Sequence, residues 1–525
     1  MGLWNHLSPP QIDVQDPSTI RKFCGQKLDH FDPEDTRTWC QRYVVNRTHY
    51  EEGGPVFICI DGEDTPWGQK RRPYTLACNN MVELAASFKA AIVALEHRYY
   101  SGDAFDGVKD FSTKNLKYHS SRQALADLSR FHDYANKKYR TAGAPWVTFG
   151  GSYPGTLSAW ARMLYPNKFV ASVASSAPLT AEAVDVADFR GSVNYIGYLD
   201  VVSSALTAPS VGGTPECLAT ITEGHEQAIE PMVTFRRREL EKKFNLCGEK
   251  PLDSTDNIAF WAGNGVISTV PQYNSATCEH TSCNVKLLCG NLSSMRSSSD
   301  SAMDALEMMQ KFQQDVQLGH DRHNPSRSTP VGFFFFARKE LSITEKVNGS
   351  SPETEGMFGR LWTYQTCTEF GWYQTCEEGS NCPFTRGYNT IEWALDLCRL
   401  LFDISPEEVR ENIESTNSFY GGADIDAPWI DWNAVKATRV VFPNGEVDPW
   451  HWEGCLVSPR PSVDTIFVKG ASHCEWMHAE KPGMPEQLIL AKSLARKYFF
   501  LNWVLNSLHS PHGPWSQDRG SKDPQ

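Results

Sequence analysis

Short apolar runs alternate with amphipathic stretches along the first third of the chain. Five apolar or β-branched runs predict strands, at residues 39–46, 55–61, 91–95, 146–149 and 169–175. Helical spacing of apolar positions predicts helices at residues 81–89 and 121–139, and another directly after Ser152. Strands that alternate with helices in this way predict a mostly parallel sheet that is covered on both faces. Residues 1–25 are polar, and we expect them to lie along the surface.

The alternation stops near residue 180. Helical patterns at residues 222–244 and 300–316 are then joined by loops rich in Ser, Thr, Gly and Cys, which is typical of an inserted domain. Strand patterns return at residues 438–442 and 464–468, and a helical pattern covers residues 485–508. The first domain is therefore expected to be completed by the end of the chain.

We expect three sections. Residues 26–180 form the first part of an α/β domain, residues 181–435 a mainly helical, disulfide-bearing insertion, and residues 436–510 the second part, with a disordered tail after residue 510. The densest apolar cluster, Phe333–Phe336, is expected to be a buried strand. No run reaches the roughly 20 apolar residues that a membrane span needs.

Charge and cysteine content narrow the class of protein. Lys and Arg total 50 and Asp and Glu total 63, so the net charge of −13 argues against nucleic acid and anionic membranes as partners. Fifteen cysteines without paired zinc spacing favour disulfides over a metal site. Cys278, Cys283 and Cys289, with His280 between them, form a poor metal pattern. We expect neither a metal nor another cofactor.

Three Asn-x-Ser/Thr tripeptides, at Asn46, Asn291 and Asn348, are potential glycosylation sites and agree with passage through a secretory route. The first 18 residues lack a basic start followed by an apolar stretch, so no signal peptide is visible. The cysteine content therefore favours a secretory route, whereas the first 18 residues show no signal peptide for that route.

The stretch that ends the predicted strand at residues 146–149 carries the first candidate for chemistry. Two glycines precede Ser152, and Leu157 and Trp160 follow at helical spacing, which predicts a strand, a sharp turn and a helix. A serine on such a turn exposes its hydroxyl above the sheet. The match to G-x-S-x-G is imperfect because Pro154 occupies the last position and the glycine follows at Gly155. An ordinary strand-to-helix turn would look similar.

A serine nucleophile needs a base and an acid that orients the base. Asp448 and His473 follow the two late strands in glycine-bearing loops, in the chain order Ser, acid, His of α/β hydrolases. Glu446 is a second candidate for the acid. Considered alone, Asp448 is also explained as the start of a turn, and His473 as a histidine without a catalytic role. Together with Ser152 they predict a catalytic triad. An oxyanion hole would use the backbone N–H of Tyr153 and one from Gly62 or Glu63.

Seven segments, spread from about residue 26 to 505, carry a family resemblance. They are LDHF (Leu28–Phe31), QRY (Gln41–Tyr43), EHRYY (Glu96–Tyr100), GGSYPG (Gly150–Gly155), WTYQTCTEFGWYQT (Trp362–Thr375), NGEVDPW (Asn444–Trp450) and GASHC (Gly470–Cys474). These segments resemble those of the lysosomal Pro-Xaa carboxypeptidase family of serine peptidases, which includes dipeptidyl peptidase II and the thymus-specific serine protease.

The resemblance implies an α/β-hydrolase domain with a helical cap, and an exopeptidase that cleaves on the carboxyl side of proline. It implies that Ser152, Asp448 and His473 are the nucleophile, the acid and the base. The partner would be a peptide with proline near one end, in a lysosomal or secreted setting, and the resemblance leaves a homodimer open. Trp450 would suit the wall of an aromatic slot for proline, although core packing explains it equally well.

This chain departs from the family pattern at two places next to the expected substrate site. The carboxypeptidase and dipeptidyl peptidase II have a second His after the catalytic one, whereas this chain has Cys474, as in the thymus-specific member; residues 451–454 also lack their glycine-rich run. The choice between carboxypeptidase and dipeptidyl peptidase therefore stays open. A catalytically silent binding protein and an esterase or lipase with the same triad are the alternatives, because one fold hosts many chemistries.

Overall fold

The structure is a computed structural model. It describes residues 20–63, 78–100, 111–181, 197–246, 249–267, 270–320, 353–421, 438–458 and 461–499. Within these ranges no helix has both the length and the apolar character needed to cross a membrane.

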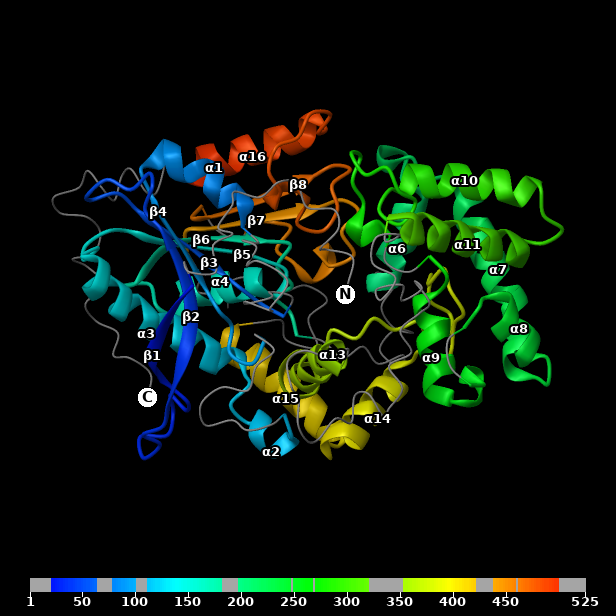
Figure 1. Cartoon of the computed structure of the whole chain (residues 1–525), viewed down its shortest axis with the longest axis horizontal. Coiled ribbons are helices and arrows are strands. Elements are labelled where there is room, and N and C mark those ends of the chain that lie inside the picture. The colour runs from blue at the N-terminus through cyan, green and yellow to red at the C-terminus, as the bar shows by residue number, and fades with distance from the viewer. Residues whose placement is uncertain are drawn as a thin grey trace.

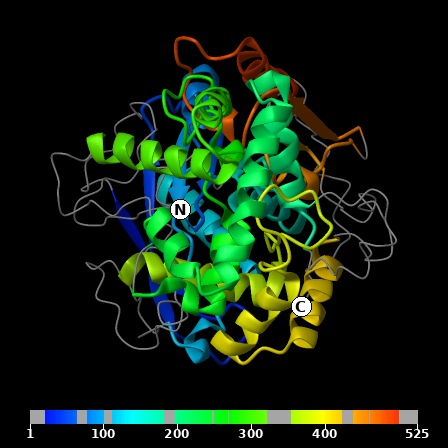
Figure 2. The ribbon, with the colours of Figure 1, turned by 90° about the vertical axis from the view of Figure 1, so that its right-hand side faces the viewer.

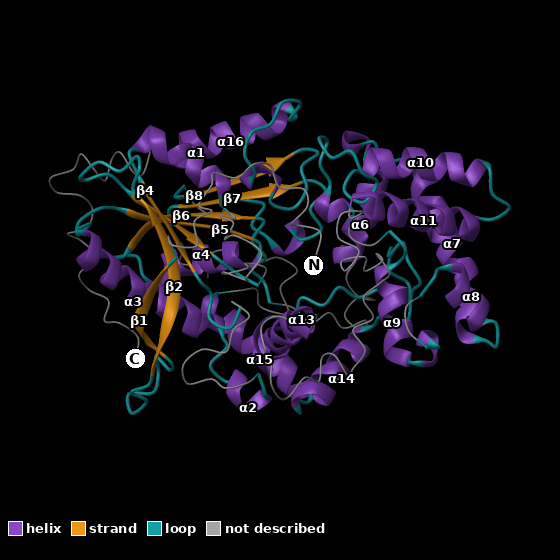
Figure 3. Cartoon of the chain, in the orientation of Figure 1, coloured by secondary structure: helices purple, strands orange, loops and turns teal. Residues whose placement is uncertain are grey.

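A single sheet organises the described chain (Figure 3). Its strands are β1 (Arg21–Lys27), β2 (Thr38–Asn46), β3 (Val56–Ile60), β4 (Ala91–Leu95), β5 (Trp146–Gly151), β6 (Phe169–Ser175), β7 (Val440–Gly445) and β8 (Val463–Val468). They lie in the order β1-β2-β4-β3-β5-β6-β7-β8. β2 is antiparallel to β1 and β4, and the pairs from β4 to β8 are parallel. This order and the mostly parallel pairing are those of the α/β-hydrolase fold, as predicted.

Alternate residues of the central strands supply two apolar layers. On β3, Ile58 packs with the cluster beneath α3 (Ser121–Tyr139) and α4 (Tyr153–Leu164). Its neighbour Phe57 packs with the cluster beneath α1 (Asn79–Phe88) and α16 (Glu486–Phe499). Every residue of β3 and β4 is buried, because helices cover both faces of the sheet (Figure 1).

The described helices between β6 and β7 lie beside the strands rather than on their outer faces, and Figure 2 looks onto this helical side of the molecule. They are α6 (Tyr198–Thr207), α7 (Pro215–Val233), α8 (Arg237–Lys243), α9 (Thr255–Asn264), α10 (Val285–Ser297), α11 (Ala302–His320), α13 (Glu353–Gln365), α14 (Ile391–Phe402) and α15 (Pro406–Tyr420). A short helix, α2 (Thr113–Leu116), precedes α3. The chain positions agree with an insertion, while its exact boundaries stay a prediction.

One sequence-based expectation was incomplete and another was wrong. Residues 21–25 lie at the surface as expected, but they form part of the edge strand β1; three of the seven residues of β1 are exposed, and its charged side chains hide the strand signal. The expected helix at 222–244 is two helices, because α7 contains Pro231 and ends where Thr234 is extended (φ −111°, ψ −173°). The predictions for Phe333–Phe336 and for the tail after residue 510 lie outside the described residues.

Disulfides account for most of the cysteines, as the composition indicates. The pairs are Cys24–Cys40, Cys59–Cys78, Cys217–Cys289, Cys278–Cys283, Cys367–Cys398 and Cys376–Cys382. Among the described cysteines, Cys455 and Cys474 are free thiols, and both are buried. Cys247 lies outside the described residues. No group of metal-ligating side chains occurs within the described ranges.

Candidate active site

Ser152 lies at the sharp turn between β5 and α4, as predicted. Its backbone has φ 64° and ψ −137°, a conformation that a non-glycine residue adopts only when the surrounding structure enforces it. Its amide N–H donates to the carbonyl oxygen of Ser175 on β6 at 2.9 Å. The elbow is thus fixed to the neighbouring strand, and the Ser152 side chain is half-buried rather than enclosed.

Glycines allow the close packing around this turn. A Cβ atom on Gly150 would lie 2.1 Å from the carbonyl oxygen of Pro154, so a side chain there would displace the first turn of α4. A Cβ atom on Gly62 would lie 2.4 Å from Cγ of Pro154. The loop after β3 therefore packs directly against the first turn of α4, next to Ser152.

Asp448 and His473 come together at the carboxyl ends of β7 and β8. Nδ1 of His473 donates to Oδ1 of Asp448 at 2.8 Å, and the same carboxylate oxygen accepts from the N–H of Trp450 at 2.9 Å. The rival acid, Glu446, instead accepts from the N–H of Gly470 at 2.8 Å. The geometry thus pairs the histidine with Asp448.

Both partners of this pair are almost fully buried, with side-chain exposures of 1% for His473 and 0% for Asp448. Within the described residues, Nε2 of His473 and Oδ2 of Asp448 have no hydrogen-bond partner. Because Nδ1 is engaged by Asp448, Nε2 is the ring atom left to exchange a proton with another group.

The pair has an electrostatic consequence. Burial opposes a charge on His473, but the attraction of the Asp448 carboxylate is stronger, and the pKa of His473 is raised well above its usual 6.5. The site therefore stabilises a positively charged imidazole. This property suits a base that must hold a proton between two steps.

The histidine loop touches the serine elbow. The carbonyl oxygen of Ser175, which accepts from Ser152, also lies 3.8 Å from Sγ of Cys474. The N–H of Cys474 donates to Oγ of Ser176 at 2.9 Å, and a Cβ atom on Gly151 would lie 2.8 Å from Cys474 Sγ. The residues next to Ser152 and His473 are thus in contact across the ends of β5, β6 and β8.

The predicted oxyanion donors lie at the same turn. Tyr153 is the first residue of α4, so its N–H has no acceptor within the helix. Gly62 contacts the elbow through Pro154, and Glu63 follows it in the chain. The N–H of Ser152 is engaged by Ser175 and does not compete for this role.

The side chain of Tyr153 takes part in a buried network that the sequence reasoning missed. Nδ1 of His97 bonds to the carbonyl oxygen of Arg98 at 2.8 Å, so Nδ1 carries the proton and Nε2 accepts from the Tyr153 hydroxyl at 3.0 Å. Nε2 of Gln365 donates to the same hydroxyl at 3.0 Å. Burial lowers the pKa of His97 to about 4, so the ring stays neutral. The only sequence signal was that His97, Tyr153 and Gln365 lie in three of the segments that carry the family resemblance.

Aromatic rings surround Trp450, two residues after Asp448. Its ring centroid lies 5.0 Å from that of Tyr198 and 6.4 Å from that of Trp372, which stacks on Phe370 at 4.4 Å. Trp450 is 8% exposed. It belongs to the apolar core and also borders the triad acid, so both interpretations of this residue agree with its position.

Two of the three glycosylation candidates lie on described elements. Asn46 ends β2 and Asn291 lies on α10, and both are half-buried. Nδ2 of Asn291 donates to the carbonyl oxygen of Leu287 at 2.8 Å. Asn348 lies outside the described residues. Modification at these positions stays a prediction.

Comparison with known proteins adds a family match. The family described as serine carboxypeptidase S28 matches residues 26–495. The thymus-specific serine protease of Mus musculus is 32% identical over 475 residues, which cover 89% of this chain and 84% of that protein. The lysosomal Pro-X carboxypeptidase of Bos taurus is 25% identical over 501 residues, which cover 92% of this chain and 87% of that protein.

Proposed function

The chain belongs to the serine carboxypeptidase S28 family of serine peptidases, and from this premise we propose that it is an exopeptidase that cleaves on the carboxyl side of proline. Ser152 is the nucleophile, His473 the general base and Asp448 the acid that orients it. The observation that carries the proposal is the 2.8 Å hydrogen bond between His473 and Asp448, which leaves Nε2 of the histidine for Ser152.

The reaction follows from these roles. Nε2 of His473 takes the proton of the Ser152 hydroxyl while the oxygen attacks the prolyl carbonyl, and the imidazolium is stabilised by Asp448. The backbone N–H groups of Tyr153 and of Gly62 or Glu63 stabilise the negative oxygen. His473 then gives the proton to the leaving amine, and an acyl-enzyme remains on Ser152. Water repeats the steps and releases the product that ends in proline.

The preference for proline is assigned to the aromatic residues beside the acid. Trp450, Tyr198 and Trp372 supply the flat apolar surfaces that a rigid pyrrolidine ring requires. The name of the relative lysosomal Pro-X carboxypeptidase supports a lysosomal setting, and the six disulfides among the described residues agree with an oxidising compartment, lysosomal or secreted. Family likeness leaves a homodimer open.

Two matched peptides test the proposal and resolve the class of exopeptidase. One has a free amine and begins Xaa-Pro; the other has a blocked amine and ends Pro-Xaa with a free carboxylate. Cleavage of the first alone means a dipeptidyl peptidase, and cleavage of the second alone means a carboxypeptidase. The Ser152→Ala variant is the control. If neither peptide is cut from pH 4 to 8, the proline assignment is wrong.

A short-chain ester and a triglyceride emulsion test the alternative of an esterase or lipase with the same triad. Hydrolysis of the esters without cleavage of either peptide would favour this alternative over the peptidase. A chain that cleaves neither class of substrate, and whose biological effect survives Ser152→Ala, would be a silent binding protein.

A further inference from the structure

The loop that carries His473 is held from outside the sheet by a segment of the helical insertion. The N–H of His473 donates to the carbonyl oxygen of Gln272 at 3.2 Å. Gln272 lies in the 3-10 turn Pro271–Tyr273, between α9 and α10. The main chain of the proposed base is thus fixed by a residue far away in the sequence.

A second contact involves Glu475, two residues after His473. Its Oε2 accepts from the N–H of Ser472 at 3.1 Å, and the side chain of Ser275 faces its carboxyl group and helps to lower its pKa. Glu475 is 6% exposed and Ser472 is 2% exposed. The contacts of His473 and of Glu475 therefore run to the same segment of the insertion.

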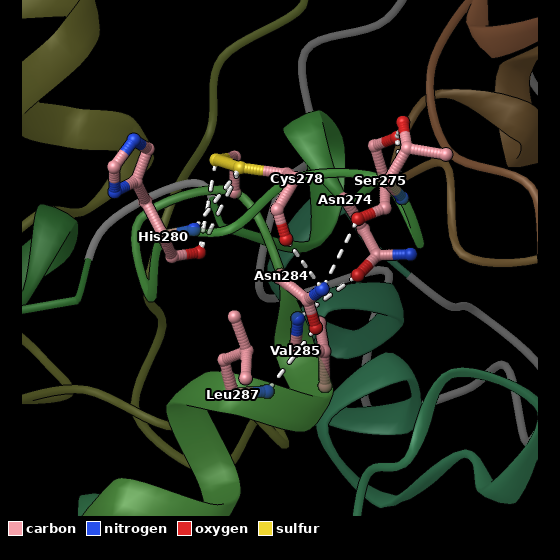
Figure 4. Close-up of a disulfide and its surroundings, with 9 residues drawn as sticks. Asn274, Ser275, Cys278, His280, Asn284, Val285 and Leu287 are labelled. Atoms are coloured by element: carbon pink, nitrogen blue, oxygen red, sulfur yellow. Dashed lines mark hydrogen bonds between the residues drawn. A yellow bond between two sulfur atoms is a disulfide. The ribbon is translucent and has the colours of Figure 1, made fainter. Parts of the chain in front are cut away.

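That segment is itself rigidly closed (Figure 4). Cys278 and Cys283 form a disulfide, and the N–H of Ser275 donates to the carbonyl oxygen of Cys283 at 2.8 Å. Nδ2 of Asn284 donates to the carbonyl oxygens of Ser275 at 3.2 Å and Cys278 at 2.8 Å. Oδ1 of Asn284 accepts from Leu287, which ties the segment to the start of α10. We call residues 271–284 the brace.

The brace also contacts the aromatic cluster. The hydroxyl of Tyr198 donates to Oε1 of Gln272, and the ring of Tyr198 packs edge-on against Trp450. Gln272 thus bonds to the His473 main chain through its carbonyl and to the proposed proline slot through its side chain.

We propose that the brace, through Gln272 and Ser275, positions the His473 loop for catalysis, with Glu475 as the residue on which Ser275 acts. Gln272, Ser275 and Glu475 are positioning residues, because they act through His473 and do not touch the reacting atoms. The inference rests on the proposed role of His473 as general base. It deepens that role by making the geometry of the base depend on the helical insertion.

The surroundings of Glu475 give the proposal a readout beyond stability. Burial raises the pKa of Glu475 to about 7. The segment Glu475–Met477 packs against α1 and α16, where Glu83 and Lys492 form an ion pair with each other at 2.9 Å. On the side of the brace, Glu475 meets the neutral side chain of Ser275. The titratable residues near Glu475 in the chain are His473, Cys474 and His478.

The direction of the pH dependence follows from the raised pKa of Glu475. The contribution of Glu475 to folding is fully present below the pKa of about 4.5 of the unfolded chain and is lost as pH rises through about 7. Burial is the cause of this loss, since the contacts with Ser472 and Ser275 favour the ionised carboxylate. The hold of the brace on the His473 loop is therefore expected to change as Glu475 ionises near pH 7.

The test measures how fast a fluorophosphonate probe labels Ser152 in the full chain between pH 5 and 9. Replacing both Cys278 and Cys283 by Ser should slow labelling by about 10-fold or more, since small misplacements of a catalytic group are costly. The matched control replaces Cys376 and Cys382 by Ser, because that disulfide closes a similarly short loop whose backbone bonds to Asn389 rather than to the His473 loop. The control should label at nearly the wild-type rate.

Two milder variants cover the case in which the disulfide variant does not fold. Ser275→Ala should slow labelling by about 3-fold, with Ser380→Ala as the control, because Ser380 bonds only within the Cys376–Cys382 loop. Glu475→Gln keeps a neutral hydrogen-bonding group, so its labelling should lack the step near pH 7 that we expect from the ionisation of Glu475, while the rise through the pKa of His473 remains.

The outcomes separate the two claims. If the wild type is not labelled at Ser152, the proposed function fails. If it is labelled and Ser152→Ala is not, but the brace variants match their controls at every pH, the positioning role is wrong.

Discussion

Nδ1 of His473 donates to Oδ1 of Asp448 at 2.8 Å in a site where both side chains are almost wholly excluded from solvent. A buried carboxylate is costly unless it is paired, so the contact fixes the tautomer and the orientation of the ring together. Because Nδ1 is occupied, any proton that the ring exchanges passes through Nε2. The first predictions concern this pair and the serine that it serves.

Ser152→Ala should leave the fold intact and lower kcat by about 10⁴-fold or more, because the acyl-enzyme needs the hydroxyl oxygen. Steady-state hydrolysis of the two proline peptides measures the loss, and circular dichroism checks the fold. Activity within a few-fold of the wild type would remove Ser152 from the mechanism.

Asp448→Asn should lower kcat by about 10⁴-fold, because the amide no longer fixes the tautomer that presents a basic Nε2. Glu446→Gln is the matched control, since Glu446 bonds to Gly470 rather than to His473. The Glu446 variant should keep kcat within about 10-fold of the wild type. The opposite ranking of the two variants would mean that Glu446 is the acid.

The pH profile should reveal the raised pKa of His473. A general base must be neutral, so kcat/KM should fall as pH decreases through a value above 6.5, which is the usual pKa of histidine. The measurement is kcat/KM for a peptide without groups that titrate between pH 5 and 9. An acidic limb centred well below 6.5 would contradict the stabilised imidazolium.

Tyr153→Phe should destabilise the protein by about 1–3 kcal/mol, because the buried side chains of His97 and Gln365 each lose a hydrogen-bond partner. The backbone N–H of residue 153 remains, so labelling of Ser152 by a fluorophosphonate should change less than stability. Urea unfolding gives the free energy. Unchanged stability would show that the network contributes nothing to the fold.

Gly62→Ala should slow the reaction, because the added methyl group would lie 2.4 Å from the ring of Pro154 and must displace the loop or the elbow. We expect a drop in kcat of about 10-fold or more, with KM affected less. Gly290→Ala is the control. Gly290 lies on α10, and a Cβ atom added there would have no other atom within 4 Å. Equal rates for both variants would place the oxyanion donors elsewhere.

The sequence by itself determined the sheet apart from its edge strand β1, and it indicated the three residues of the proposed triad. The central strands, including β3 and β5, are continuous apolar runs because helices cover both of their faces, and such runs are visible without a structure. Ser152, Asp448 and His473 each follow a predicted strand. Parallel strands bring their carboxyl ends to one edge of the sheet, so chain order alone predicted that these side chains gather there.

The tertiary structure alone decided what surrounds that edge. Tyr153 meets Gln365, and His473 meets Gln272, across more than 200 residues of mostly helical sequence. Helical periodicity reports which face of a helix is apolar, but not which distant loop that helix carries to the site. The contacts that support the base and the elbow come from the packing of the insertion on the sheet, and local sequence patterns do not encode that packing.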